Sequence, residues 1–427
     1  MKIGILGGGL SGLALRYFLK GDTVILEKAA ECGGLCRSVK VNGFVFDQGG
    51  HILFSKDKAI LHLIRHILAG NIVMKRRNNK IYYKNTFIKY PFENGLSGLS
   101  KKDNYDCLLG FLQNDSPRPI NFKQWLFFNF GRAISEKYLV PYNEKIWKYD
   151  LSMMGLEWVE RVPKPPLEDI IKSSLGMETE GYLHQLFYFY PRSGGIQSLI
   201  QRLENKKNGP IITNFEVRKI CKRGSGWEVS NGNRSLFFDK IISTIPIFDL
   251  LNSMNLVPKG VSQALRKLKY NSLRAVMIGL SENNLTPYSA VYFPAKKFPF
   301  HRVCFMSNFT RNNAPAGHSS LVAEITSPAD AALHKTNDKD LIDNVISNLH
   351  SLGIINSNKV CLSKVERVKY AYVIYDLGYK RNVSIVKAYL EAQGIFLNGR
   401  FAEFEYINMD EVLRRSWRLS GRLNAQA

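Results

Sequence analysis

A glycine-rich turn near the N-terminus constrains the fold of this chain more than any other feature. Residues 2–6 (KIGIL) form an apolar run typical of a strand, residues 7–12 (GGGLSG) follow with the spacing G-x-G-x-x-G, and residues 13–19 continue as a helix. Residues 23–26 (TVIL) predict a second strand, which ends in Glu27. This order predicts a parallel βαβ unit that binds a dinucleotide.

The glycines and the acid of this unit each have a physical role. Gly7 permits the tight turn, Gly9 lets the backbone approach a pyrophosphate, and Gly12 lets the helix pack closely on the strand. The N-terminus of the helix then faces the phosphate charge. Glu27, at the end of the second strand, is placed to accept hydrogen bonds from a ribose.

Two further glycine pairs favour FAD over NAD as the dinucleotide. The segment AECGGLCRS places Gly34 and Arg37 directly after the second strand, where backbone can approach the flavin side and the arginine supplies a fixed charge. The segment GFVFDQGGHILF breaks at Gly50 and His51, which places backbone against something flat and large. A β-bulge with a buried, hydrogen-bonded histidine is the alternative interpretation.

Length, charge and cysteine spacing narrow the class of protein. A chain of 427 residues predicts two or three domains, and the net charge of +23 favours anionic partners. Lys and Arg are spread along the chain and no nucleic-acid motif occurs, so we expect no nucleic-acid partner. The six cysteines lack zinc spacing, which predicts no metal site and suits a reducing cytoplasm. Apolar runs stay shorter than 18 residues, so we expect no membrane span. We interpret the opening segment as part of the mature folded protein rather than as a signal peptide.

From these motifs onward the sequence resembles the flavin-containing amine oxidase superfamily. Along most of its length it resembles one branch of that superfamily, the UDP-galactopyranose mutases. The turn with Glu27 and the segment GGLCRS are superfamily-wide, whereas PYNEKIW at 141–147 and the segment at 292–308 are more specific to mutases. The other matching segments are FDQGGHILFS, KYPFEN, WVERVP, YPRSGGI and GRFAEFEYINMD.

We expect an α/β fold: a Rossmann-like FAD-binding domain with an inserted helical domain and an antiparallel β-sheet domain. The predicted FAD-binding domain is discontinuous and comprises residues 1–90, 190–250 and 365–427. Residues 95–185 carry helical patterns and predict the uridine-binding domain. Residues 255–365 contain several segments with the alternating pattern of strands and one clear helix. This pattern predicts an antiparallel sheet that covers the sugar.

The resemblance implies a set of substrate contacts. Arg161 and Arg302 match the two arginines that hold the diphosphate in mutases, and a planar guanidinium suits phosphate oxygens. Tyr142, Asn143 and Trp147 match the residues beside the uracil. Alternatively, Trp147 is simply a core anchor.

Further contacts are also implied by the resemblance alone. Tyr292, Tyr375 and Tyr406 match tyrosines of the phosphate and sugar pocket. Tyr372 and Tyr379 lie close to Tyr375 in the sequence, so either is an alternative match at that position. The remaining implied contacts are Gln185 to the substrate, and Val217, Arg400, Asn408 and Met409 to the cofactor. Bacterial mutases often carry Asp at the position of Asn408, which puts the sugar contact in doubt.

The activity that the resemblance implies is ring contraction of a UDP-linked hexopyranose to its furanose, without net redox. Reduced FAD, the active form, supplies the nucleophile at N5. His51 would lie near N5, and Arg161 and Arg302 would stabilise the departing diphosphate. The first alternative is an amine oxidase-type oxidoreductase or desaturase acting on an amine, a carotenoid-like or a porphyrin-like substrate. The second is a non-catalytic flavin or nucleotide-sugar binding protein.

The partners expected on this interpretation are a UDP-sugar and a reductant. No second nicotinamide-binding fingerprint occurs, so NAD(P)H would share the active site or a reductase would supply electrons. Because such furanoses usually serve surface polysaccharides, we expect a cytoplasmic enzyme of polysaccharide biosynthesis. We also expect a homo-oligomer. Peripheral association with membrane glycosyltransferases would fit its positive charge.

Overall fold

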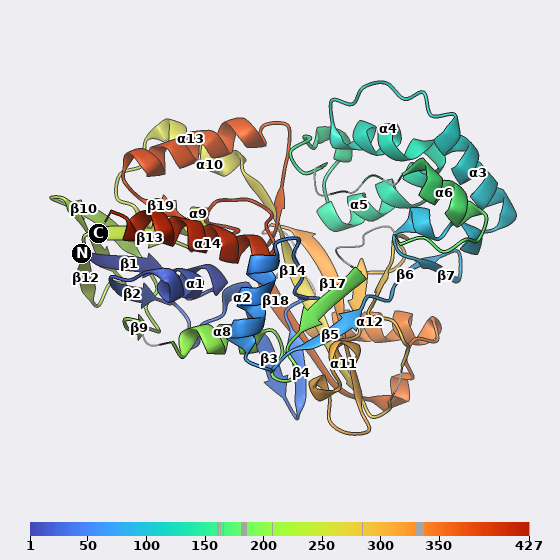
Figure 1. The fold of residues 1–427 in the computed structure, drawn as a ribbon, viewed down its shortest axis with the longest axis horizontal. Coiled ribbons are helices and arrows are strands. Elements are labelled where there is room, and N and C mark those ends of the chain that lie inside the picture. Colours follow the sequence, from blue (N-terminus) through green and yellow to red (C-terminus); the bar gives the residue numbers. More distant parts are fainter. Residues whose placement is uncertain are drawn as a thin grey trace.

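The computed structural model describes the chain except residues 160, 161, 163, 165, 181–185, 207, 284, 330–336 and 427. Figure 1 shows a parallel sheet layered with helices on one side of the molecule and a cluster of helices on the other. A large, mostly antiparallel sheet runs between these two parts. The predicted α/β class, with parallel and antiparallel sheets, is confirmed.

The N-terminal unit forms the centre of a five-stranded parallel sheet. Its strand order is β19 (Phe396–Leu397), β13 (Lys240–Ser243), β1 (Lys2–Leu6), β2 (Asp22–Leu26) and β9 (Ile211–Ile212). The central strands are apolar because helices cover both faces of the sheet. One face packs on α1 (Leu10–Phe18), α2 (Lys58–Leu68), α8 (Gln197–Glu204) and α14 (Met409–Asn424).

The opposite face of this sheet is covered by a second helical layer. It comprises α9 (Ile247–Ser253), α10 (Lys259–Lys267) and α13 (Tyr379–Ala392). A three-stranded antiparallel sheet joins the same core, formed by β10 (Lys219–Arg223), β11 (Gly226–Ser230) and β12 (Ser235–Phe238).

The mostly antiparallel sheet has seven strands. Their order is β18 (Val360–Ile374), β14 (Lys269–Leu280), β17 (Ser319–Pro328), β16 (Arg302–Cys304), β15 (Ala290–Tyr292), β6 (Asn79–Tyr83) and β7 (Thr86–Lys89). The outer face packs on α12 (Asp338–Ser351), the helix expected in this region. β6 and β7 lie within residues 1–90, yet they extend this sheet through the parallel pairing of β6 with β15. The domain limits therefore stay a prediction.

Short elements connect these layers. β3 (Ser38–Val41) pairs with β4 (Phe44–Asp47), β5 (Val73–Arg76) pairs with β8 (Phe187–Tyr190), and α11 (Met306–Phe309) follows β16. Of the helices in the described part of the chain, none is long and apolar enough to cross a membrane.

The helical cluster comes from the region in which helical patterns were expected. It contains α3 (Lys101–Leu112), α4 (Phe122–Ile134), α5 (Val140–Trp147) and α6 (Leu167–Ser174). A π-helical turn at Ser135–Leu139 joins α4 to α5. Gly131 has a φ of +71°, and a β-carbon there would lie 2.2 Å from the carbonyl oxygen of Gly110, so glycine permits the close approach of α3 and α4.

A buried lysine ties this helical cluster to the seven-stranded sheet. Lys145 of α5 is only 6% exposed, and its Nζ donates to the carbonyl oxygens of Phe293 and Ala295 at 2.7 and 2.8 Å. Burial, together with the nearby Lys148, lowers the pKa of Lys145 to about 7. The lysine thus gives two strand-end carbonyls a partner at the expense of burying a charge.

Replacing Lys145 with Met should change how stability depends on pH. The pKa of Lys145 is lower in the folded chain than in the unfolded one, so between pH 7 and 10 the unfolded chain binds more protons and stability rises with pH. We expect the wild-type protein to gain up to about 1.4 kcal/mol of unfolding free energy per pH unit relative to Lys145→Met. Urea denaturation at pH 7, 8 and 9 measures this, with the exposed Lys101→Met as control. If the unfolding free energy changed with pH in the same way for the wild type, Lys145→Met and Lys101→Met, the prediction would be wrong.

Candidate active site

One large cavity runs along the carboxyl ends of the parallel strands and continues against the seven-stranded sheet. Its volume is about 1470 Å³. A site for one small ligand typically measures about 300–1,000 Å³. The cavity therefore has room for a large cofactor and a second ligand beside it.

The N-terminal glycine turn forms one end of the cavity. Glu27 is 7% exposed, and its carboxylate accepts from the backbone N–H of Gly8 at 2.7 Å and of Ala29 at 2.9 Å. These bonds fix the carboxylate at the end of β2 and leave acceptor capacity for ribose hydroxyls.

The second glycine loop lies directly on the first. The N–H of Gly33 donates to the carbonyl of Gly8 at 2.9 Å, and a β-carbon on Gly9 would meet only Gly34, at 3.8 Å. Gly9 precedes the first residue of helix α1 and offers no side-chain cap, so the free N–H groups of the first turn are available to an anion. Two side-chain-free turns and an uncapped helix end fit the pyrophosphate of a dinucleotide.

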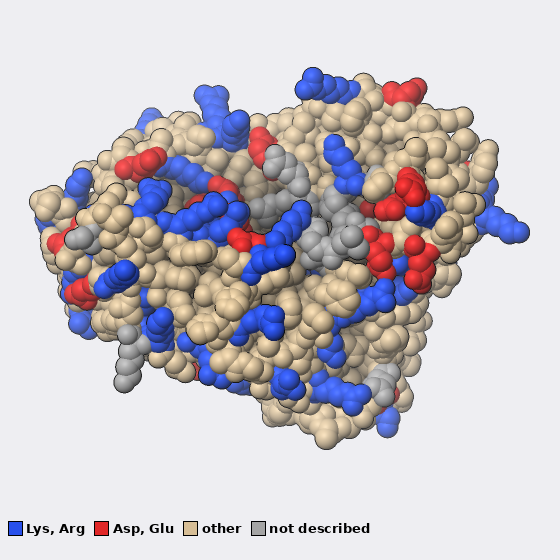
Figure 2. All heavy atoms as spheres, in the orientation of Figure 1, with Lys and Arg blue, Asp and Glu red and all other residues tan. Residues whose placement is uncertain are grey.

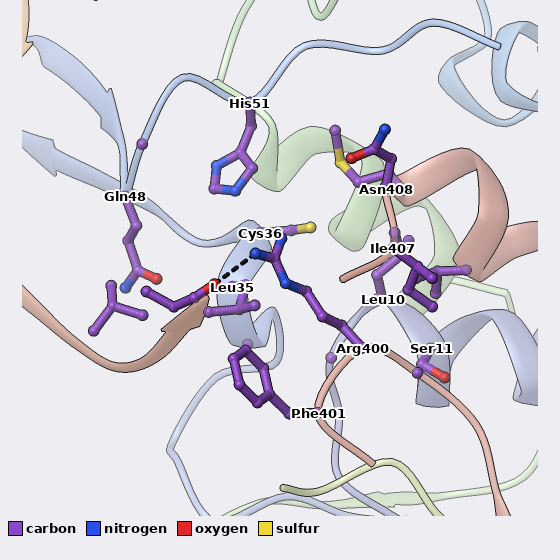
Figure 3. Close-up of a pocket in the computed structure, with 18 of the residues that line it drawn as sticks. Leu10, Ser11, Leu35, Cys36, Gln48, His51, Arg400, Phe401, Ile407 and Asn408 are labelled. Carbon is purple, nitrogen blue, oxygen red and sulfur yellow. Dashed lines mark hydrogen bonds between the residues drawn. The ribbon is translucent and has the colours of Figure 1, made fainter. Parts of the chain in front are cut away.

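His51 and Arg400 define the next part of the cavity, where they point toward the same space from different elements (Figure 3). Arg400 donates to the carbonyl oxygen of Ala371 at 2.5 Å and packs over the Tyr406 ring at 4.0 Å. Burial, partly opposed by the charge of Glu324, lowers the pKa of His51 to about 4, so the ring is neutral at pH 7. Nδ1 of His51 and Nε of Arg400 have no partner among the described residues. This is where an isoalloxazine ring would fit.

Aromatic rings and an arginine surround the far end of the cavity. Tyr90 stacks on Tyr292 with centroids 4.6 Å apart, and Tyr372 stacks on Tyr406 at 5.8 Å. The Trp158 ring lies edge-on to Tyr406 at 5.3 Å. Its buried indole N–H has no partner in the described part of the chain.

Arg302 enters this end from β16, held by a buried carboxylate. Its Nη2 donates to both oxygens of Glu324 at 2.7 Å, and Glu324 is fully buried. The same carboxylate accepts from the N–H of Gly50 at 2.8 Å. Although burial raises it, the pKa of Glu324 lies well below its usual range because of Arg302 and His301. Glu324 therefore fixes both the arginine and the turn that carries His51.

Most of the residues predicted for the site lie in the cavity wall. They are Gly7, Gly9, Glu27, Gly34, Arg37, Gly50, His51, Val217, Tyr292, Arg302, Arg400, Tyr406, Asn408 and Met409. Gly12 lies behind the turn, where a β-carbon would come within 2.0 Å of the Gly7 carbonyl oxygen. Arg161 and Gln185 lie outside the described residues. Whether the lining residues bind the expected ligands stays a prediction.

The structure places Tyr142, Asn143 and Trp147 outside the described cavity wall. Trp147 is 1% exposed and donates to Oδ1 of Asn143 at 3.1 Å, so it is a core anchor, the alternative considered above. Asn143 in turn donates to the carbonyl of Leu139. Tyr142 lies one layer back, with its ring centroid 5.6 Å from that of Tyr292.

Tyr375 also lies in the core rather than in the described wall, where its hydroxyl accepts from the N–H of Tyr406 at 2.6 Å. Tyr372, near the end of β18, lines the cavity in its place, whereas Tyr375 follows the last residue of that strand. Sequence reasoning also missed Tyr90, Trp158 and Glu324. Tyr90 and Trp158 sit in the matching segments KYPFEN and WVERVP, and Glu324 is a lone acid in the apolar strand SLVAEIT.

Comparisons with known proteins agree with the class of protein that this fold and site define, a flavin-binding α/β protein. Residues 20–388 match the family model of flavin containing amine oxidoreductases, and the chain belongs to that family. The cofactor is FAD. The two glycine turns, Glu27, Arg400 and the start of α14 all line the cavity.

Individual relatives point to different activities. A crystal structure of reduced UDP-galactopyranose mutase superposes with a TM-score of 0.91 at 24% identity, covering 100% of this chain and 96% of that one. A putative protoporphyrinogen oxidase from Exiguobacterium sp. 255-15 gives 0.79 at 18% identity, covering 100% and 99%. Coproporphyrinogen III oxidase of Bacillus subtilis (strain 168) is 21% identical over 96% of this chain and 95% of its own length. At these identities the likeness establishes the fold and leaves the reaction open.

Replacing Gly12 with Ala should release the cofactor. The added β-carbon would lie 2.0 Å from the Gly7 carbonyl oxygen, which would push the helix away from the phosphate turn. We expect loss of bound flavin and a destabilisation of roughly 1–3 kcal/mol. Gly421→Ala in α14 is the control, since its β-carbon meets nothing within 4 Å and should stabilise by about 0.5 kcal/mol. Flavin absorbance and urea denaturation measure both, and full flavin retention by Gly12→Ala would count against the phosphate turn.

Replacing Glu324 with Gln should destabilise the fold strongly. The change leaves the half-buried Arg302 without its counter-charge and removes the charge from a fully buried position, which costs about 3 kcal/mol. As control, Glu136→Gln removes an exposed pair with Arg132 and should stay within about 0.5 kcal/mol of wild type. Equal unfolding free energies for the two variants would show that the pair of Glu324 with Arg302 contributes no more to stability than an exposed pair.

Proposed function

We propose that this protein is a flavin-dependent mutase that interconverts the pyranose and furanose forms of a UDP-linked sugar. The observation that carries the proposal is Arg302, which lies in the wall of the same cavity as His51 and Arg400. A fixed guanidinium at this point suits a substrate whose leaving group is a diphosphate.

Buried donors without partners support an acceptor-rich substrate. Within the described residues these include Nε of Arg302 and Nε1 of Trp158, and both residues line the cavity. A buried donor left unsatisfied costs about 1–3 kcal/mol, so the cavity favours a ligand that supplies oxygen acceptors at these positions. Phosphate and sugar hydroxyl oxygens meet that need, whereas an apolar substrate does not.

In this proposal the chain binds and orients the substrate rather than supplying a nucleophile. Reduced FAD supplies a nucleophilic nitrogen, N5, for the anomeric carbon. Arg302, with Arg161 as its proposed partner, stabilises the departing diphosphate, and Glu324 holds Arg302 in place. Tyr90, Tyr292, Tyr372 and Tyr406 enclose the sugar and exclude water.

The second candidate is an oxidase that acts on a porphyrin-like substrate. It is favoured by the likeness to the coproporphyrinogen III oxidase of Bacillus subtilis, which extends over 96% of this chain. The two candidates differ in electron balance: an oxidase passes electrons from its substrate to an acceptor such as oxygen, whereas a mutase returns the flavin unchanged.

Incubation with nucleotide sugars separates these candidates. We expect the dithionite-reduced protein to convert one member of a panel of UDP-hexoses, including UDP-galactose and UDP-N-acetylgalactosamine, to its furanose without forming hydrogen peroxide. Chromatography and proton NMR identify the product. Stoichiometric peroxide from coproporphyrinogen, with every sugar unchanged, would replace the mutase proposal by the oxidase.

Replacing Arg302 with Lys tests the diphosphate contact without leaving Glu324 unpaired. Lys keeps the charge but loses the planar set of donors. We expect UDP to bind roughly 10- to 100-fold more weakly, with bound flavin retained. Isothermal titration with UDP measures the affinity, and the exposed Arg218→Lys serves as control. Unchanged UDP affinity would remove Arg302 from the substrate site.

A further inference from the structure

Helices α10 and α13 lie at the outside of the part of the molecule that holds the parallel sheet, where they share an outward face (Figure 1). Their inner residues, among them Leu265 and Val386, are buried in the same core. The outward stripe of α10 carries Lys259, Gln263 and Arg266, which follow one another at helical spacing. Neither helix has a described element over this face.

The outward stripe of α13 continues the pattern. Arg381, Ile385 and Ala388 are exposed and lie on one side of the helix, with the exposed Lys380 beside them. We call the exposed residues of the two helices, with the loops that precede them, the α10–α13 face. It presents five cations, Lys259, Arg266, Lys267, Lys380 and Arg381, and one exposed acid, Glu391. Figure 2 shows Lys and Arg side chains projecting at this edge.

Apolar side chains stand at both ends of this face. Leu256, in the loop before α10, is 86% exposed, the highest value for a large apolar side chain in the described part of the chain. Its carbonyl accepts from the Tyr389 hydroxyl at 2.7 Å, so the loop is fixed against α13 and holds the leucine outward. Leu377, before α13, is 56% exposed. Tyr389 lies ten residues after Tyr379, the first residue of α13, which is a rise of roughly 15 Å along the helix.

We infer that the α10–α13 face binds a membrane surface that contains anionic lipid, with Leu256 entering the headgroup layer. Basic side chains near such a surface attract anionic headgroups, and one or two apolar side chains add contact with the acyl boundary. A polyanion such as nucleic acid would use the cations but not a projecting leucine. The inference is independent of the function proposed for the cavity, because the five cations and Leu256 lie outside its described lining.

Co-sedimentation with vesicles tests this inference on the full, FAD-loaded chain. We expect binding to phosphatidylcholine vesicles that contain phosphatidylserine, little binding to phosphatidylcholine alone, and a decrease at high salt because exposed charges are screened. The variant with Lys259, Arg266, Lys380 and Arg381 all changed to Glu should bind at least about tenfold more weakly. Leu256→Ser should also weaken binding, and to a similar degree at low and high salt.

A matched control separates this face from net charge. The variant with Lys75, Lys101, Lys219 and Lys222 changed to Glu removes the same charge from other exposed positions and should keep most of the binding. Equal losses in the two charge-reversal variants would overturn the inference, as would equal binding to vesicles with and without phosphatidylserine. Tighter binding to duplex DNA than to anionic vesicles, lost in the α10–α13 variant alone, would assign the face to nucleic acid instead. Flavin absorbance and circular dichroism confirm that each variant is folded.

Discussion

The contact of Glu324 with Arg302 and Gly50 holds together the two halves of the cavity. Glu324 and Arg302 stand on adjacent strands of the seven-stranded sheet, whereas Gly50 belongs to the turn that follows β4. A β-carbon on Gly50 would lie 2.5 Å from Sγ of Cys304, so only glycine lets this turn lie against the sheet. One fully buried carboxylate thus neutralises an arginine and satisfies a backbone donor at the boundary between the two halves of the cavity. Because such a pair is costly to break, the separation of the two halves is fixed by the fold.

The chemical nature of the cavity surface changes from one side of that contact to the other. At the nucleotide end its surface is backbone, since Gly8 and Gly33 meet without side chains. At the far end the surface is rings and a guanidinium, from Tyr292, Trp158 and Arg302. The backbone end suits a cofactor that family members share, and the side-chain end is where a substrate would be distinguished. This division explains why relatives named for a mutase and for porphyrinogen oxidases share the fold at low identity.

Sequence reasoning predicted the features that depend on neighbours in the chain. The strand, the turn and Glu27 lie within 27 residues, and local steric rules fix their conformation. The positions of Trp147 and Trp158 are harder to predict, because both follow helical segments. Only tertiary packing decides which of the two rings is buried and which lines the cavity. Tyr372 stands near the end of β18 and Tyr375 just beyond it, so the point where the strand ends and its register decide which of the two rings faces the cavity. β18 does shift register opposite β14 in this region, which no local pattern indicates.

The positive charge of this chain has two different environments. In the cavity and beside it, two guanidinium groups are paired with carboxylates: Arg302 with Glu324, and Arg415 with Glu403, Glu405 and Glu411. Such pairing fixes geometry and leaves little charge for long-range attraction. On the α10–α13 face, Lys259 and Arg381 have no ion pair among the described residues, so their charge extends into solvent. Directed hydrogen bonds therefore suit recognition in the cavity, whereas the exposed charge of the outer face attracts an anionic partner at longer range.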